Sequence, residues 1–415
     1  MEFSKYGLQV PKTLLPKSNV DWTKWSVIAV DQYTSQMEYW DEVDRMVGNA
    51  PSTLRLVWPE AWLESDKNSH NPDSIKSKMH EYMRSDIFEE KTGFIHTQRT
   101  LRNGEVRSGL VANIDLECYE FNPKEEALIK STEGTIVTRL PARIDVREKA
   151  DLEVTHVMLL IDDRQNLLMR MLDSLDKDII YDFDLMMNSG HIIGNLVSKK
   201  DEAQIAVCLE KIIAKNRSKT LFGVGDGNHS LAAAKSHWEN IKGSLSREEL
   251  LLHPSRFAMV EIVNLYDRGL GFEPIHRIVK SDNADLFFEK LIEEFKQIGE
   301  VSPGPISDAF HYKYCLRGKT HDIYLSCNYS LAITALQETI DNIAKTDSHI
   351  IVDYIHGEDV VKQLSSGNVL GIILPDFQKS GLFKTIEKGK VLPRKSFSMG
   401  MAHEKRFYLE CRFIK

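Results

Sequence analysis

The stretch of sequence that decides the fold is Thr220-Leu-Phe-Gly-Val-Gly-Asp-Gly-Asn-His-Ser-Leu-Ala-Ala-Ala-Lys235. A short apolar run breaks into a turn rich in glycine and polar side chains, and the pattern after the turn predicts a helix. Such a turn aims backbone N–H groups outward at the start of the helix, where unpaired donors and the positive end of the dipole favour an anion. The stretch therefore predicts a strand-turn-helix unit that handles phosphate.

The turn also has a purely structural interpretation, because glycine-rich turns join strands to helices in many proteins that bind nothing there. Asn228 can cap the helix, and a buried stripe is expected along it. The residues of that stripe are Leu231, Ala234, Trp238 and Ile241. This interpretation leaves Asp226, His229 and Ser230 without a structural role.

Three established motifs do not fit the turn. A P-loop needs Lys and then Ser or Thr after its last glycine, but Gly227 is followed by Asn-His-Ser. The dinucleotide fingerprint has a third glycine where this chain has Ser230. His229 and Ser230 are neighbours on a helix and point about 100° apart, so they cannot form the dyad of a serine hydrolase.

The composition is that of an ordinary globular protein. The chain has 415 residues, is 42% hydrophobic and 27% charged, and carries a formal net charge of −8. The acidic balance argues against bulk affinity for nucleic acid, which draws on a basic surface. The 5 cysteines form no C-x-x-C pair, which argues against a disulfide framework or a structural zinc site. No apolar run approaches the roughly 20 residues of a membrane span, and the first residues do not resemble a secretory signal, so we expect a cytoplasmic protein.

Strand and helix patterns alternate along the chain and predict an α/β or mixed α+β fold. We expect either one unit of 1–415 or two lobes, 1–250 with the N-terminal strand, a hairpin and the phosphate turn, and 251–415 as an α/β lobe. The expected strands are 25–30, 92–100, 105–118, 154–162, 256–264, 312–316 and 406–413, and the expected helices are 33–47, 72–89, 201–215, 285–298 and 335–344.

A second cluster of polar residues precedes the turn in sequence. Ser131-Thr132-Glu133-Gly-Thr135 is followed by Arg139, Arg143 and Arg147. The planar guanidinium suits phosphate or carboxylate because it donates two parallel hydrogen bonds. Pro141 is expected to prevent an uninterrupted helix through the arginines, and such charges are also common on solvated surface.

Two later loops carry further candidate anion donors. The first contains His276 and Arg277, and the second contains Arg394, Lys395 and Ser396. A structural role for His276, satisfied by hydrogen bonds, is the alternative.

Asp31 follows the first predicted strand, where a carboxylate can be held toward a cleft as a general base. The alternative for Asp31 is a cap for the helix that follows.

Several strings resemble a large family formerly called domain of unknown function 1015, which is related to serine kinases of the ParB/sulfiredoxin superfamily. The strings are Ser131-Thr-Glu-Gly-Thr-Ile-Val-Thr-Arg-Leu-Pro-Ala-Arg143, Gly225-Asp-Gly-Asn-His-Ser-Leu-Ala-Ala-Ala234, Val263-Asn-Leu-Tyr-Asp267, Phe272-Glu-Pro-Ile-His-Arg277, Asp353-Tyr-Ile-His-Gly-Glu-Asp359 and Leu392-Pro-Arg-Lys-Ser-Phe-Ser-Met-Gly400. The resemblance spans nearly the whole chain. It implies a ParB/sulfiredoxin-like core with a mixed sheet and additional helical and β elements. In that superfamily the turn reads roughly Gly-x-His-Arg and holds phosphates, so Ser230 stands where arginine is expected.

The resemblance also implies an activity, the transfer of a phosphoryl group from inorganic pyrophosphate to the hydroxyl of free L-serine, assisted by Mg²⁺. It implies that Asp31 acts as the catalytic base, together with His229 and Asp226, and that Asp226 also binds Mg²⁺. The residues it implies for phosphate binding are Gly227, Asn228, His229, Ser230, Arg143, Arg394 and Lys395. Those it implies for substrate binding are Thr132, Glu133, Thr135, His276, Arg277 and Ser396. The absence of ATP-kinase signatures agrees with a pyrophosphate donor.

Two other functions stay open at this point. One is a ParB-like nucleotide-binding or DNA-associated switch protein, which the acidic balance and the lack of a recognisable helix-turn-helix disfavour. The other is a phosphoserine phosphatase. The partners expected are small molecules, without nucleic acid or membrane, and the sequence leaves the phosphoryl donor, the metal stoichiometry and the oligomeric state open.

Overall fold

The computed structural model describes residues 3–63, 70–135, 140–154, 157–347, 349–393 and 395–415. The chain forms two compact units, one of Met1–Leu270 with Met401–Lys415 and one of Gly271–Gly400. The expected boundary after residue 250 falls inside helix α8 (Arg247–Leu252) of the first unit. Both units combine helices with strands, so the mixed α/β class predicted from the sequence is confirmed. A ParB/sulfiredoxin-like core stays a prediction.

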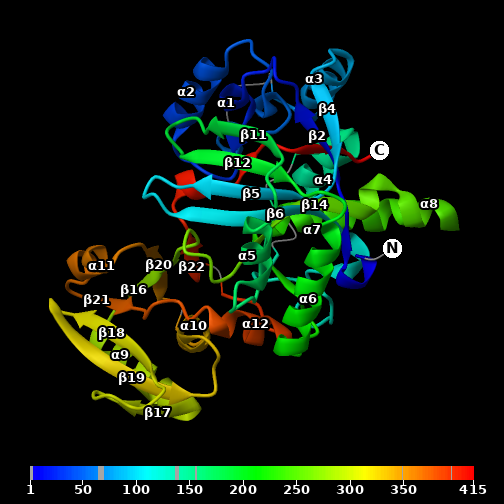
Figure 1. Cartoon of the computed structure of the whole chain (residues 1–415). Coiled ribbons are helices and arrows are strands. Elements are labelled where there is room, and N and C mark those ends of the chain that lie inside the picture. Colours follow the sequence, from blue (N-terminus) through cyan, green and yellow to red (C-terminus); the bar gives the residue numbers. More distant parts are fainter. Residues whose placement is uncertain (1–2, 64–69, 136–139, 155–156, 348, 394) are drawn as a thin grey trace. The chain divides into compact units, whose positions relative to one another are not determined.

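A mixed sheet forms the centre of the first unit (Figure 1). Its ten strands within the described residues are, in spatial order, β11 (Ile179–Asp184), β12 (His191–Leu196), β5 (Ile95–Thr100), β6 (Val106–Asp115), β14 (Phe257–Asn264), β10 (Met158–Ile161), β13 (Phe222–Asp226), β8 (Ile129–Ser131) and β7 (Tyr119–Glu120), with β1 (Leu8–Gln9) paired to the end of β6. Strand β13 is antiparallel to β10 but parallel to β8. Because β8 and β13 run in the same direction, the residues that follow them lie at the same edge of the sheet.

Helices pack against both faces of this sheet (Figure 1). The remaining helices of the first unit are α1 (Trp22–Trp25), α2 (Met37–Val47), α3 (Pro72–Arg84), α4 (Leu140–Lys149), α5 (Leu167–Asp173), α6 (Glu202–Asn216) and α7 (Asn228–Lys242). One core joins α5, α6 and α7 to the face that carries Leu159, and the other joins α1, α2 and α3 to the face that carries Val111. The predicted stripe on α7 is confirmed, with Leu231, Ala234 and Trp238 buried.

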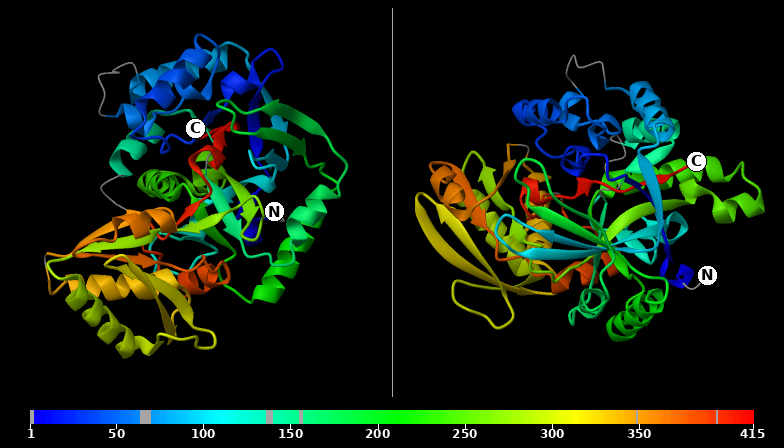
Figure 2. Two further views of the ribbon diagram at one scale, coloured as in Figure 1. Left: turned by 90° about the vertical axis from the view of Figure 1, so that its left-hand side faces the viewer. Right: turned by 45° about the horizontal axis from the view of Figure 1, so that its top comes forward.

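The C-terminal segment returns into the first unit and pairs with its N-terminal strands (Figure 2). It contributes to a four-stranded sheet in the order β4 (Phe88–Thr92), β2 (Lys12–Pro16), β24 (Cys411–Phe413) and β9 (Leu152–Val154), and to a two-stranded pair of β23 (Phe407–Tyr408) with β3 (Val27–Ile28). Between these pairings the Arg406 guanidinium Nε lies 3.0 Å from Glu261 Oε2, and both side chains are almost wholly buried. Arg406 also pairs with Glu410. Buried charges of this kind hold a segment firmly because separating them leaves an unpaired charge in the core.

The second unit has a six-stranded sheet, a two-stranded pair and four helices within the described residues. In spatial order the strands of the sheet are β17 (Gly299–Ser302), β19 (Lys319–Cys327), β18 (Phe310–Leu316), β21 (Val369–Ile373), β16 (His276–Lys280) and β20 (Ile351–Ile355). The two-stranded pair is β15 (Phe272–Pro274) with β22 (Phe397–Met399). The helices are α9 (Ala284–Ile298), α10 (Ala332–Ala344), α11 (Glu358–Leu364) and α12 (Ser380–Glu387). The pairing of β15 with β22 brings the His276 and Lys395 loops of the sequence together within this unit.

Several expected elements are corrected. The helix expected over 72–89 ends at Arg84, and the strand β4 takes its last residues. The strand expected over 25–30 is confined to Val27–Ile28 because α1 occupies the preceding residues. The strand expected over 406–413 is divided between two sheets. Pro141 does not prevent a helix over Arg143 and Arg147, because it is the second residue of α4, where no intrahelical N–H bond is needed. Arg139 lies outside the described residues.

We predict that Glu261→Gln lowers the free energy of unfolding by roughly 3–5 kcal/mol, because it leaves Arg406 without a charged partner at Glu261 in the core. Urea unfolding followed by circular dichroism measures the change. Glu126→Gln is the matched control, since its pair with Lys219 is 2.8 Å long but about three-quarters exposed, and we expect it to cost about 0–1 kcal/mol. Equal losses in the two variants would contradict a central role for the buried pair.

Candidate active site

The strand-turn-helix predicted from the sequence is present. Strand β13 ends at Asp226, Gly227 adopts a left-handed backbone with φ +81°, and α7 begins at Asn228. Glycine enters this conformation at little cost, whereas a residue with a Cβ is strained there. The first helical bond runs from Leu231 N–H to Gly227 O, so the N–H groups of the preceding residues point beyond the helix start.

The purely structural interpretation of the turn expected Asn228 to cap the helix. Asn228 does not do so, because the N-cap position is Gly227. The Asn228 side chain is buried, and its Oδ1 accepts hydrogen bonds from Ser131 Oγ at 2.5 Å and from Thr132 N–H at 3.3 Å. Its Nδ2 donates to Val224 O at 3.4 Å. Asn228 therefore ties the segment after β8 to the turn after β13.

This tie brings two motifs that are far apart in the sequence to one edge of the sheet. Thr132 is buried and its hydroxyl donates to Val224 O at 2.6 Å, so its polar groups are engaged within the protein. Glu133 O lies 3.0 Å from the Ser131 Oγ that donates to Asn228 Oδ1. Thr135 Oγ1 is shielded from solvent and has no hydrogen-bond partner among the described residues. The predicted contacts of Thr132, Glu133 and Thr135 with substrate stay predictions.

At the turn itself, Asp226 divides its carboxylate between two partners. Its Oδ1 accepts the Gly227 N–H at 3.0 Å, so this N–H, which was expected to bind phosphate, is already used. Its Oδ2 lies 3.4 Å from Lys405 Nζ, and both side chains are 15% exposed. His229 and Ser230 follow, both half-buried. A lysine ammonium thus lies beside the start of α7.

Lys405 was not among the site residues predicted from the sequence. The backbone around it is held by two buried guanidiniums: Arg99 donates to His403 O at 2.7 Å, and Arg107 donates to Glu404 O at 2.9 Å. Burial lowers the pKa of both arginines. The charged run that ends at Arg406 was the available signal, but nothing in the sequence links that run to the turn.

Arg143 projects from α4 and forms an ion pair with Glu60. It lines a cavity of about 190 Å³ together with Ser230 and Tyr408. The Glu60 N–H donates to Val30 O at 2.9 Å, which anchors the Glu60 side of this cavity to the residue before Asp31.

Tyr408 connects these residues electrostatically. Burial raises the pKa of its phenol, the negative charges of Asp31 and Asp226 raise it further, and the charge of Arg143 lowers it. Side chains predicted to act as base, metal ligand and phosphate ligand thus all influence the pKa of one buried tyrosine. Their grouping required residues from four separate stretches of the chain.

Asp31 lies in a turn beyond β3, is exposed, and accepts a hydrogen bond from Gln32 Nε2 at 3.0 Å. The capping alternative for Asp31 is wrong, because the N-cap position of α2 is Gln36. Its role as a base stays a prediction.

The other predicted site residues belong to the second unit, apart from Arg394, which lies outside the described residues. His276 is buried, its Nδ1 accepts Leu374 N–H at 3.2 Å, and burial lowers its pKa. The structural alternative for His276 thus fits its surroundings. Arg277 is fully buried, donates to Gln337 Oε1 at 2.7 Å, and has its pKa lowered to about 10 by burial.

Lys395 and Ser396 lie beside this arginine. Lys395 O accepts from Arg277 at 3.1 Å, and the Lys395 ammonium lies 5.2 Å from the Tyr354 ring centre. Ser396 is buried and donates to Pro393 O at 2.5 Å. These contacts stabilise the second unit, and the predicted contacts of its residues with phosphate or substrate stay predictions.

Within the described residues no group of three or more His, Cys, Asp or Glu side chains is placed to hold a metal ion. None of the described helices is both long and apolar enough to cross a membrane.

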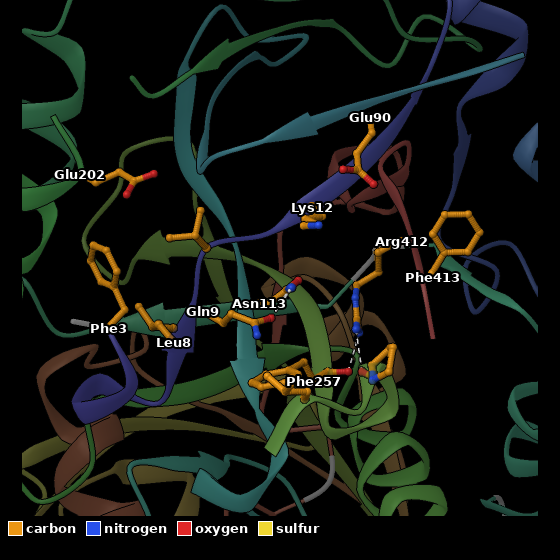
Figure 3. A pocket seen from close by; sticks show the side chains of 13 residues that line it. Phe3, Leu8, Gln9, Lys12, Glu90, Asn113, Glu202, Phe257, Arg412 and Phe413 are labelled. Carbon is orange, nitrogen blue, oxygen red and sulfur yellow. Dashed lines mark hydrogen bonds between the residues drawn. The ribbon is translucent and has the colours of Figure 1, made fainter. Parts of the chain in front are cut away.

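A larger cavity of about 670 Å³ lies elsewhere in the first unit (Figure 3). Asn113 lies beside Gln9 in its wall and donates to Gln9 Oε1 at 3.1 Å, while Arg412 enters from β24 (Figure 3). Its described lining contains none of the site residues predicted from the sequence.

Comparison with known proteins identifies the family. Residues 13–410 match the family described as "Protein of unknown function (DUF1015)". The chain belongs to this family. No curated protein matches the sequence.

Solved structures with some likeness to this DUF1015 protein are distant. A free serine kinase in complex with AMP is 11% identical with a TM-score of 0.36, over 72% of this chain and 90% of that chain. SbnI with a C-terminal truncation from Staphylococcus aureus is 10% identical with a TM-score of 0.35, over 72% and 82%. A conserved hypothetical protein from Pyrococcus furiosus is 11% identical with a TM-score of 0.32, over 70% and 90%. At these scores the likenesses carry no argument about this chain.

We predict that Asn228→Ala lowers the free energy of unfolding by about 1–3 kcal/mol, since it leaves buried polar groups near Ser131 and Thr132 unsatisfied. Urea unfolding measures the loss. Asn240→Ala is the matched control because Asn240 is an exposed residue of the same helix, and we expect a change within about 0.5 kcal/mol. If the two variants are equally stable, the tie between β8 and the turn is unimportant.

Proposed function

We propose that the chain is a phosphotransferase that moves a phosphoryl group from inorganic pyrophosphate to the hydroxyl of free L-serine. The observation that supports a phosphate site most strongly is the start of α7, which has outward N–H groups and a lysine ammonium beside it. Pyrophosphate and serine come from the family resemblance, and the start of α7 with Lys405 supports a place for the phosphate.

In this proposal Lys405 replaces the cation that the family pattern has at Ser230. The N–H groups of Asn228, His229 and Ser230 bind phosphate oxygens, with the His229 side chain beside them. Lys405 leaves or shares its contact with Asp226, which at 3.4 Å is longer than a close ion pair. Arg143 contributes a second positive charge from the cavity wall. Fixed positive groups of this kind stabilise the charge that develops on the transferred phosphoryl group.

The proposed transfer exchanges a P–O bond of pyrophosphate for a P–O bond to serine. The serine Oγ attacks one phosphorus of pyrophosphate, the bond from that phosphorus to the bridging oxygen breaks, and inorganic phosphate leaves. The hydroxyl proton passes to the Asp31 carboxylate, which is exposed and serves no helix cap. The products are O-phospho-L-serine and phosphate.

Asp226 fits the Mg²⁺ that the resemblance implies, because Mg²⁺ is commonly bound by one or two carboxylates together with substrate phosphates. The Asp226 carboxylate lies two residues before the first residue of α7. When bound there, Mg²⁺ would neutralise negative charge on the phosphate oxygens.

We predict that the protein forms phosphoserine from L-serine and pyrophosphate in the presence of Mg²⁺, followed by phosphorus NMR. Parallel reactions contain ATP or ADP as donor. Formation of phosphoserine with none of the donors would sink the proposal, and nucleotide binding without turnover, or salt-dependent DNA binding, would favour a ParB-like switch instead.

We further predict that Lys405→Met lowers kcat/KM about a hundredfold, the usual order for one lost donor to a charged transition state. Lys219→Met removes an exposed lysine and should leave the rate unchanged. An unchanged rate in Lys405→Met would show that another group supplies the missing cation.

A further inference from the structure

A cluster of buried charges lines the cavity that Ser230 and Arg143 also line. Arg147 Nη1 lies 2.6 Å from Glu153 Oε2, and Arg412 Nη1 lies 2.8 Å from Glu153 Oε1. The three side chains are between 5% and 13% exposed. Arg147 and Glu153 belong to the cavity wall.

The cluster carries one excess positive charge. Burial alone would raise the pKa of Glu153, but the charges of Arg147 and Arg412 lower it to about 2. Glu153 is therefore a carboxylate at neutral pH, and one negative charge faces two guanidiniums. An excess buried charge is costly unless a counter-charge reaches it.

Only one of the two arginines has N–H groups that lack an acceptor. Arg412 gives its remaining contacts to Phe257 O at 2.5 Å and Pro254 O at 2.6 Å. Nε and Nη2 of Arg147 are shielded from solvent and have no acceptor among the described residues. Nε and Nη2 form one edge of the guanidinium, which matches the two oxygens of a carboxylate.

Trp58 also lines this cavity and carries a third unused donor. The indole Nε1 of Trp58 is shielded from solvent and, like the Arg147 edge, lacks an acceptor in the described part of the chain. The rest of the wall is largely apolar, with Leu56, Val57, Met79, Val146, Ala233 and Ile414 among its residues. At about 190 Å³ the cavity lies below the roughly 300–1,000 Å³ of sites for drug-sized ligands.

We infer that Arg147 and Trp58 bind the carboxylate of the acceptor substrate, which is a small hydroxy acid. The inference rests on the proposed phosphotransfer and deepens it. With the carboxylate at the Arg147 edge, the rest of the molecule occupies a cavity whose wall also includes Ser230 of the phosphate turn. The acceptor is thus selected by its carboxylate, and its hydroxyl is presented to the turn.

The test titrates the full-length protein with L-serine and with L-serinamide, which keeps the hydroxyl and the amine but lacks the carboxylate. The readout is the indole N–H signal of Trp58 in proton–nitrogen NMR, identified by its loss in Trp58→Phe. We expect L-serine to shift this signal and L-serinamide to leave it in place. Equal shifts with both compounds, or no shift with L-serine, would overturn the inference, as would a shift with pyrophosphate alone.

Variants extend the test to kinetics. Arg147→Lys keeps the charge but loses the two-donor edge, and we expect KM for L-serine to rise about 10- to 100-fold, the equivalent of one charge-assisted hydrogen bond. Pyrophosphate affinity should stay unchanged. Arg170→Lys, at an exposed position of α5, is the matched control and should leave both constants unchanged.

Trp58→Phe guards against a variant that fails to fold, because it removes the indole N–H and keeps a smaller aromatic ring at the same position. We expect KM for L-serine to rise severalfold with kcat almost unchanged. Normal KM values in folded Trp58→Phe and Arg147→Lys would refute the carboxylate site while leaving the phosphotransfer intact. Carboxylate-dependent shifts without any phosphoserine would instead refute the phosphotransfer and leave the carboxylate site in place.

Discussion

The buried ion pair between Arg406 and Glu261 is the interaction on which the first unit depends. It fastens the end of the chain to the central strand β14, and Arg99 and Arg107 hold the preceding carbonyl groups. Burying so many charges is costly, and the pairing of Arg406 with Glu261 and Glu410 inside the core offsets part of that cost. The consequence for the site is direct, since Lys405 precedes this pair and Tyr408 follows it.

A second constraint is the parallel pairing of β8 and β13. It places the ends of both strands at one edge of the sheet, where Asn228 links them through Ser131 and Thr132. Outward N–H groups of α7, Lys405 and Arg143 then provide positive potential in one region, while Asp226 and Asp31 provide carboxylates. An anionic substrate that develops further charge during reaction suits this combination.

The sequence was informative where structure is local. A strand, a left-handed glycine and an amphipathic helix follow one another at the turn, and each can be predicted from neighbouring residues. The hydrogen bond between the Asn228 side chain and Ser131 was not predictable, because the two residues lie 97 positions apart in the sequence. Lys405 was missed for the same reason. The cations of the second unit were visible in the sequence, but the burial of His276 and Arg277 follows from their place in strand β16, which lies between β20 and β21.

The most direct test of the central claim is a crystal structure of the protein soaked with pyrophosphate and Mg²⁺. We predict an anion at the start of α7, with oxygens within hydrogen-bond distance of the Ser230 N–H group and of Lys405 Nζ. An anion bound away from residues 226–230 and Lys405 would contradict the proposed phosphate site.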